Sequence, residues 1–85
     1  MEQVPTVVSF QIESPASLRV TFSNEVIKRF SFQDKLSEYP FNALNNESFF
    51  KSATIDRGGY GISWSDQIDI SENELWEKGV DVEGK

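Results

Sequence analysis

The chain has 85 residues and a net charge of −6, and it contains neither cysteine nor histidine. Without cysteine it forms no disulfide bond and no thiolate zinc site. Without histidine it lacks the commonest general base and the commonest transition-metal ligand. Its seven phenylalanines, two tryptophans and two tyrosines suffice for a small core, so we expect one folded domain.

The negative charge is concentrated towards the C-terminus. Residues 66–85 carry seven acidic side chains against two lysines, whereas residues 1–65 carry seven acidic side chains against six basic ones. Such a surface repels a phosphate backbone and attracts a basic protein, which favours a protein partner over a nucleic acid. A surface that only keeps the protein soluble explains the same charge.

Two stretches near the N-terminus alternate between apolar and polar side chains, as half-buried strands do. In residues 7–12 we expect Val8 to share one face with Phe10. Residues 14–17 predict a turn, and residues 18–22 predict the second strand.

A third strand at residues 26–32 completes an antiparallel meander. Residues 23–25 predict the connecting hairpin turn, in which Asn24 takes a positive φ. Lys28 and Arg29 interrupt the alternation of the third strand. This interruption indicates a bulge or an exposed edge that is able to pair with another chain.

The middle of the chain is irregular until a second hairpin. Glu47–Phe50 fits one helical turn, and residues 53–56 and 61–64 fit two strands. The glycines between these strands, in residues 57–60, permit the positive φ values of a tight hairpin turn.

The C-terminal helix has the clearest signals. Ser71 is an N-cap with Glu74 three residues later, which makes a capping box, and Gly79 suits the left-handed position after a helix. The sequence therefore predicts a helix over residues 72–78, followed by a loose acidic tail at residues 80–85.

These elements together predict an α+β fold. We expect a small antiparallel sheet of about five strands, made of the N-terminal meander and the later hairpin, with a short C-terminal helix across one face or end. The whole chain, residues 1–85, forms a single domain with an ordered core at residues 6–79.

Several motifs follow one another in the order and spacing of a known family. They are Phe22–Asn24, Phe41, Leu44 with Asn45, Phe49–Phe50, Trp64, Asp69–Glu72 and Leu75–Trp76. Over residues 17–79 the chain thus resembles the small bacterial and archaeal family known as domain of unknown function 2442. Glu25 stands where that family usually has glycine, which leaves the type of the turn open.

The resemblance implies a partner rather than a reaction. Members of the family are often encoded beside a second small uncharacterised protein, in pairs that look like toxin–antitoxin arrangements. An antitoxin-like or regulatory role with a small protein partner is what this implies. The resemblance supplies no catalytic residue.

Metal-dependent and enzymatic functions find little support. Asp66, Asp69 and Glu72 form the densest acidic cluster, but their spacing does not fit a calcium-binding loop. Paired carboxylates also serve glycoside hydrolysis, yet we expect a chain of this size to have little room for a substrate cleft. A turn and a helix N-terminus explain these acids, and we expect no metal and no cofactor.

A platform for single-stranded nucleic acid is the main alternative to a protein partner. Lys28, Arg29, Lys51 and Arg57 lie near aromatic residues, as basic residues do on such platforms. They are few for a chain of this net charge, and solvated strand faces explain them as well. The glycines of residues 57–61 lack the spacing of a phosphate-binding loop.

The two tryptophans have different predicted roles. We expect Trp64 in the core, where it locks the helix onto the sheet. Trp76 directly follows an apolar helix residue and cannot share its direction, so it lies at the rim beside Asp69, Glu72 and Glu77. There it either packs against the edge of the sheet or anchors a partner.

The sequence therefore predicts a non-enzymatic interaction module. The predicted contact residues are Trp76, the acids Asp69, Glu72 and Glu77, and the basic pair Lys28 and Arg29. The partner is a small protein, basic and encoded nearby, or a second copy joined through an edge strand. A nucleic-acid-binding or transcription-related accessory module and a small enzyme subunit are the alternatives.

The expected location is the cytoplasm. No apolar run approaches the roughly 20 residues of a membrane span. Residues 1–5 lack the charged and apolar regions of a signal peptide.

Overall fold

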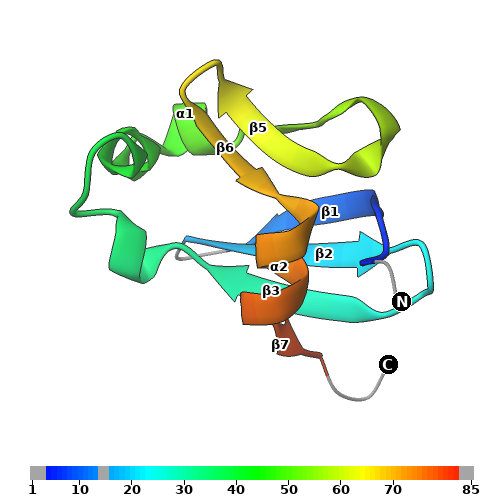
Figure 1. Cartoon of the computed structure of the whole chain (residues 1–85). Coiled ribbons are helices and arrows are strands. Elements are labelled where there is room, and N and C mark those ends of the chain that lie inside the picture. Colours follow the sequence, from blue (N-terminus) through cyan, green and yellow to red (C-terminus); the bar gives the residue numbers. More distant parts are fainter. Residues whose placement is uncertain (1–3, 14–15, 83–85) are drawn as a thin grey trace.

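The computed structural model describes residues 4–13 and 16–82, which form two antiparallel sheets and two short α-helices (Figure 1). The first sheet has the strand order β1-β2-β3-β7, and the second has the order β4-β5-β6. The strands of the first sheet are β1 (Val7–Glu13), β2 (Ser17–Phe22), β3 (Ile27–Ser31) and β7 (Val80–Asp81). Those of the second are β4 (Thr54–Ile55), β5 (Gly61–Ser65) and β6 (Ile68–Ser71).

The α-helices are α1 (Glu47–Phe50) and α2 (Glu72–Lys78). Three 3-10 turns complete the described elements: η1 (Gln33–Lys35), η2 (Phe41–Asn45) and η3 (Arg57–Gly59). The predicted α+β class, the antiparallel pairing and the short C-terminal helix are confirmed. The described chain differs in having seven strands in two sheets instead of about five in one. In the described residues no helix has the length and apolar character needed to cross a membrane.

The N-terminal meander is present, with one unexpected detail in β1. Alternate side chains of β2, at positions 18, 20 and 22, are at most 1% exposed, as its alternation predicts. The register between β1 and β2 shifts between Val7 and Ser9, so Val8 is an extra residue in β1. This bulge reverses the alternation. Val7 is therefore buried and Val8 is 57% exposed, which makes the predicted inward face of Val8 wrong.

The hairpin turn between β2 and β3 is stabilised in a different way from the one expected. The positive φ falls on Glu25 (φ 74°) and not on Asn24. Asn24 instead accepts a hydrogen bond from the backbone N–H of Val26 through its side-chain oxygen, at 3.1 Å. Such a local side-chain contact fixes a turn without requiring the left-handed conformation at Asn24.

The second hairpin contains a strand that the sequence analysis missed. Gly58 and Gly59 have the predicted positive φ values, 82° and 79°, and β5 returns after them. Beyond β5 the chain turns again and pairs with it as β6, in which Ile68 and Ile70 are buried. This strand is short and leads directly into the N-cap of the helix, so it carries no separate signal in the sequence.

The core lies between the two sheets and is centred on an aromatic cluster. Phe32 is fully buried, and its ring lies 4.9–6.4 Å, centre to centre, from those of Phe30, Phe41, Phe50 and Trp64. The indole N–H of Trp64 donates to the backbone carbonyl of Phe50 at 2.8 Å. Trp64 thus packs into the core as expected, but it links the second sheet to Phe32 and α1 rather than locking α2 in place.

Helix α2 begins and ends where the sequence predicts. The hydroxyl oxygen of Ser71 accepts from the backbone N–H of Glu74 at 3.1 Å, as expected for an N-cap. Gly79, however, has φ −72° and ψ 156°, so its predicted left-handed conformation is wrong. The chain leaves the helix extended because it continues directly into β7 (Figure 1).

The predicted loose tail is wrong at its first positions. Val80 and Asp81 form β7, which pairs antiparallel with β3, and the backbone N–H of Val82 donates to the carbonyl of Ile27 at 3.0 Å. This pairing joins segments far apart in the sequence, so no local pattern announces it. Residues 83–85 lie outside the described residues.

Candidate functional site: the outer face of the first sheet

Strand β7 changes the surroundings of the basic pair on β3. Val80 lies opposite Arg29 and Asp81 lies opposite Lys28, so β3 is not an open edge at these two residues. The predicted exposed third strand is therefore wrong at this point. The edge strands of the first sheet are β1 and β7.

Lys28 makes structural contacts. It lies opposite the buried Val20, on the core face of the sheet, and its side chain is 14% exposed. Its ammonium group donates to the backbone carbonyl of Trp76 at 2.7 Å and lies 3.5 Å from a carboxylate oxygen of Asp81. That carbonyl belongs to the last turn of α2, where carbonyl groups lack partners within the helix. Lys28 therefore caps the C-terminal end of α2 and joins it to the sheet.

Trp76 packs between α2 and the first sheet. The Trp76 ring meets the ring of Phe22 edge-on, with 5.1 Å between the ring centres. The ammonium group of Lys28 lies 4.2 Å from the centre of the Trp76 ring. The side chain is half-buried. These contacts agree with packing at the edge of the sheet, which is one of the two roles predicted for Trp76. Trp76 also makes the link between helix and sheet that we expected of Trp64.

The three predicted acids are not gathered into one site. Asp69 is exposed on β6, opposite Ser63. Glu72 is half-buried at the start of α2 and Glu77 is exposed near its end. Five positions on a helix correspond to a rotation of about 140°, so these two glutamates point in different directions. Among the described residues, no group of three or more His, Cys, Asp or Glu side chains is placed to hold a metal.

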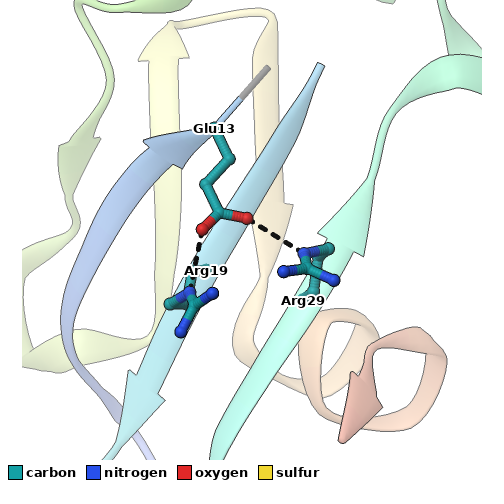
Figure 2. Close-up of polar contacts among 3 residues, drawn as sticks. All are labelled: Glu13, Arg19 and Arg29. Carbon is teal, nitrogen blue, oxygen red and sulfur yellow. Dashed lines mark hydrogen bonds and ion pairs between the residues drawn. The ribbon is translucent and has the colours of Figure 1, made fainter. Parts of the chain in front are cut away.

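Arg29 points to the opposite face of the sheet from Lys28, because successive strand residues alternate. On this outer face Arg19 of β2 lies directly opposite it in the strand register. Figure 2 shows that Glu13, at the end of β1, reaches between the two arginines. We call these three residues the paired-arginine site.

Glu13 binds both guanidinium groups of the site at once. One carboxylate oxygen accepts from Nε of Arg19 and the other from Nε of Arg29, each at 2.9 Å (Figure 2). Like charges that face each other across a sheet destabilise it, and the carboxylate offsets this repulsion. The hydrogen bonds from Arg29 and then Arg19 lower the pKa of Glu13 below its ordinary value, so its carboxylate is charged at neutral pH.

Of the three residues in the paired-arginine site, the sequence predicted a contact role for Arg29 and for neither Glu13 nor Arg19. A signal for Arg19 was present, because the hairpin turn pairs Phe22 with Val26, and counting outward along both strands brings Arg19 opposite Arg29. Glu13 had no such signal. We took Ser17 as part of the preceding turn, whereas it pairs with Glu13 and extends both strands.

The surface beside Arg29 is hollowed between β3 and the end of α2. This open hollow has a volume of about 510 Å³, and its lining includes Arg29, Asp34, Lys35, Glu74, Lys78 and Val80. This volume lies within the range of about 300–1,000 Å³ found for ligand sites, but the hollow is open to solvent rather than enclosed. Lys35 and Glu74 form an ion pair at 3.3 Å across the hollow's lining.

The residues that carry the family resemblance mostly form the core. Phe22, Leu44, Phe50 and Leu75 are buried. A family model matches residues 7–81, which include all of the paired-arginine site and β7. The chain belongs to the family described as protein of unknown function (DUF2442). No curated protein and no solved structure matches this DUF2442 chain.

Proposed function

We propose that this DUF2442 protein is a non-enzymatic interaction module that binds a protein partner through the outer face of its first sheet. The paired-arginine site is the observation that carries the proposal. Two guanidinium groups stand opposite each other on a sheet face that no described element covers (Figure 1), and the side chain of Arg29 is 50% exposed. Arginine is enriched at protein interfaces because its planar group donates several hydrogen bonds and is weakly hydrated.

We propose a non-enzymatic role because the chain has few of the side chains that catalyse reactions. The chain has no histidine and no cysteine, which leaves carboxylates, lysines and two tyrosines for acid–base chemistry. Asp69 lies on β6 and the glutamates Glu72 and Glu77 point in different directions from α2, so these acids do not form a catalytic pair. Glu13 is held charged between two arginines, an arrangement that suits recognition better than proton transfer.

The proposed partner is a small protein of the cytoplasm. The family resemblance favours a product encoded beside this chain, which an antitoxin-like or regulatory protein would bind and neutralise. Asp69 and Glu77 are exposed and belong to none of the ion pairs among the described residues, so they offer basic side chains of the partner a second contact surface.

Nucleic-acid binding, as a transcription-related accessory module, is the second candidate. One observation favours it, because two arginines lie on a sheet face of the kind that single-strand binders use. The aromatic residues that such a platform stacks against bases are missing from this face. Phe22 and Phe30 of the same sheet are buried on the other side, and the net charge of −6 opposes the approach of phosphates.

The decisive experiment is capture of partners from the native host with the tagged full chain as bait. The double variant Arg19→Glu, Arg29→Glu reverses the charge of the site, and Lys51→Glu is a matched control at another exposed basic residue. We expect a protein that the wild type and the control retain and the double variant loses. Equal capture by all three baits would show that the outer face is not the contact. Capture that nuclease treatment abolishes would favour the second candidate.

Light scattering of the purified protein distinguishes a second copy of this chain from a different protein as the partner. The edges open to another copy in the first sheet are β1 and β7, since β7 occupies the edge of β3 at Lys28 and Arg29. A homodimer would appear in light scattering of the purified wild type alone, without any captured protein.

A further inference from the structure

We infer that the paired-arginine site is a carboxylate-binding site, occupied in the free protein by Glu13 and taken over by an acidic segment of the partner. This inference rests on the proposed function and names the chemistry of the partner at the contact. Glu13 then acts as an internal competitor that keeps the site closed to weak ligands.

Glu13 uses only part of the hydrogen-bonding capacity of the two arginines. Glu13 contacts each arginine only through Nε, at 2.9 Å. In Figure 2 the dashed contacts of Glu13 reach one nitrogen of each guanidinium group, and the terminal nitrogens carry none. A guanidinium group has five N–H donors, so the terminal nitrogens give an incoming carboxylate a first contact before it displaces Glu13 from the two Nε atoms.

The surroundings favour an acidic peptide over other anions. The group that already fills the site is a carboxylate, so the spacing of the two arginines suits this anion. The hollow beside Arg29 is lined by two lysines and two acids, with Lys35 paired to Glu74, so it adds little net charge but gives an extended segment room to continue past the site. A phosphate would meet the same donors, but a nucleic acid would also meet the net charge of −6.

Nuclear magnetic resonance of the purified full chain tests the inference directly. The probe is a blocked synthetic peptide of alternating glutamate and threonine, and its glutamine counterpart is the neutral control. Inorganic phosphate is titrated separately. The Nε–H signals of Arg19 and Arg29 report occupancy at the two atoms that Glu13 now holds. We expect these signals to move with the glutamate peptide and to stay in place with the glutamine peptide.

The variants separate a ligand site from a structural ion pair. Glu13→Gln removes the competitor and should tighten binding of the acidic peptide about fivefold, because exposed ion pairs of this kind compete only modestly. Arg29→Gln should abolish the binding. Glu47→Gln, which breaks an exposed ion pair with Lys51 elsewhere, should leave the affinity unchanged.

Three results would overturn the inference. They are equal signal changes with both peptides, unchanged or weaker binding by folded Glu13→Gln, and binding of phosphate without binding of the acidic peptide. If Glu13→Gln does not fold, loss of binding in Arg29→Gln decides the question alone. The capture experiment remains independent, because a partner lost by the charge-reversed bait can bind the same face without donating a carboxylate.

Discussion

Replacing Lys28 by methionine tests whether this residue is a structural clamp or a partner contact. Methionine keeps an unbranched apolar side chain of similar length and removes the ammonium group. The lost contacts are the hydrogen bond to the carbonyl of Trp76, at 2.7 Å, the contact with its ring, at 4.2 Å, and the weak ion pair with the exposed Asp81, at 3.5 Å. With about 1.5 kcal/mol for the first and about 0.5 kcal/mol for the second, we expect the free energy of unfolding to fall by about 2 kcal/mol. A domain of this size has only about 4–13 kcal/mol in total.

Urea titration followed by tryptophan fluorescence and circular dichroism measures this loss. Asp81→Asn is the control, because it removes only the ion pair with a carboxylate that is 78% exposed. It should cost less than about 1 kcal/mol. Our reasoning would be refuted if Lys28→Met kept the stability of the wild type and lost the captured partner. Lys28 would then be a contact, as the sequence first suggested.

Three further predictions address other parts of the molecule. The lowered pKa of Glu13 means that its stabilisation is present above the ordinary carboxyl pKa of about 4.3 and is lost as the pH falls through the lower folded value. The stability difference between the wild type and Glu13→Gln should therefore shrink in strong acid, and a difference that persists there in urea titrations would contradict this. Gly59→Ala should lower the melting temperature more than Gly58→Ala, since a Cβ at Gly59 would lie 2.5 Å from the carbonyl oxygen of Val7, and equal losses would argue against this close approach. Ser71→Ala should cost about 1 kcal/mol in urea titrations through the lost N-cap, and an unchanged midpoint would show that the cap is dispensable.

Elements with local signals could be predicted from the sequence. Ser71 and Glu74 predicted the start of α2, Gly79 predicted its end, and the glycines at 58 and 59 marked a tight turn. Local signals were misleading where a turn is held by a side-chain hydrogen bond and not by a positive φ at the expected residue. Asn24 stabilises its turn through a hydrogen bond, which leaves the positive φ to Glu25.

Contacts between distant segments could not be predicted in this way. Strand β7 is two residues long, and only its pairing with Lys28 and Arg29 defines it. Lys28 broke the expected alternation because its ammonium group reaches a helix carbonyl from the core face of the sheet. The inward-facing Lys28 therefore indicated a contact with a distant segment of the chain, whereas the sequence pattern suggested that β3 is an exposed edge strand.

The candidate site was predicted only in part for a related reason. Arg29 was identified as exposed and basic, but its role depends on Arg19 across the sheet and on Glu13 one strand further away. The register of the hairpin was enough to pair the two arginines. Placing Glu13 also requires knowing where the pairing of β1 and β2 ends. Ser17 was predicted to lie in the turn, whereas it is the strand partner of Glu13.

The late position of β7 has a consequence for synthesis on the ribosome. Val80 joins the nascent chain about 50 residues after its partner Arg29, which corresponds to about 3–10 s at about 5–20 residues per second. Until β7 is available, β3 is an edge strand at Lys28 and Arg29, and an unpaired strand edge is a template for pairing with another chain. The last described strand to be made is therefore the one that protects the first sheet on this side.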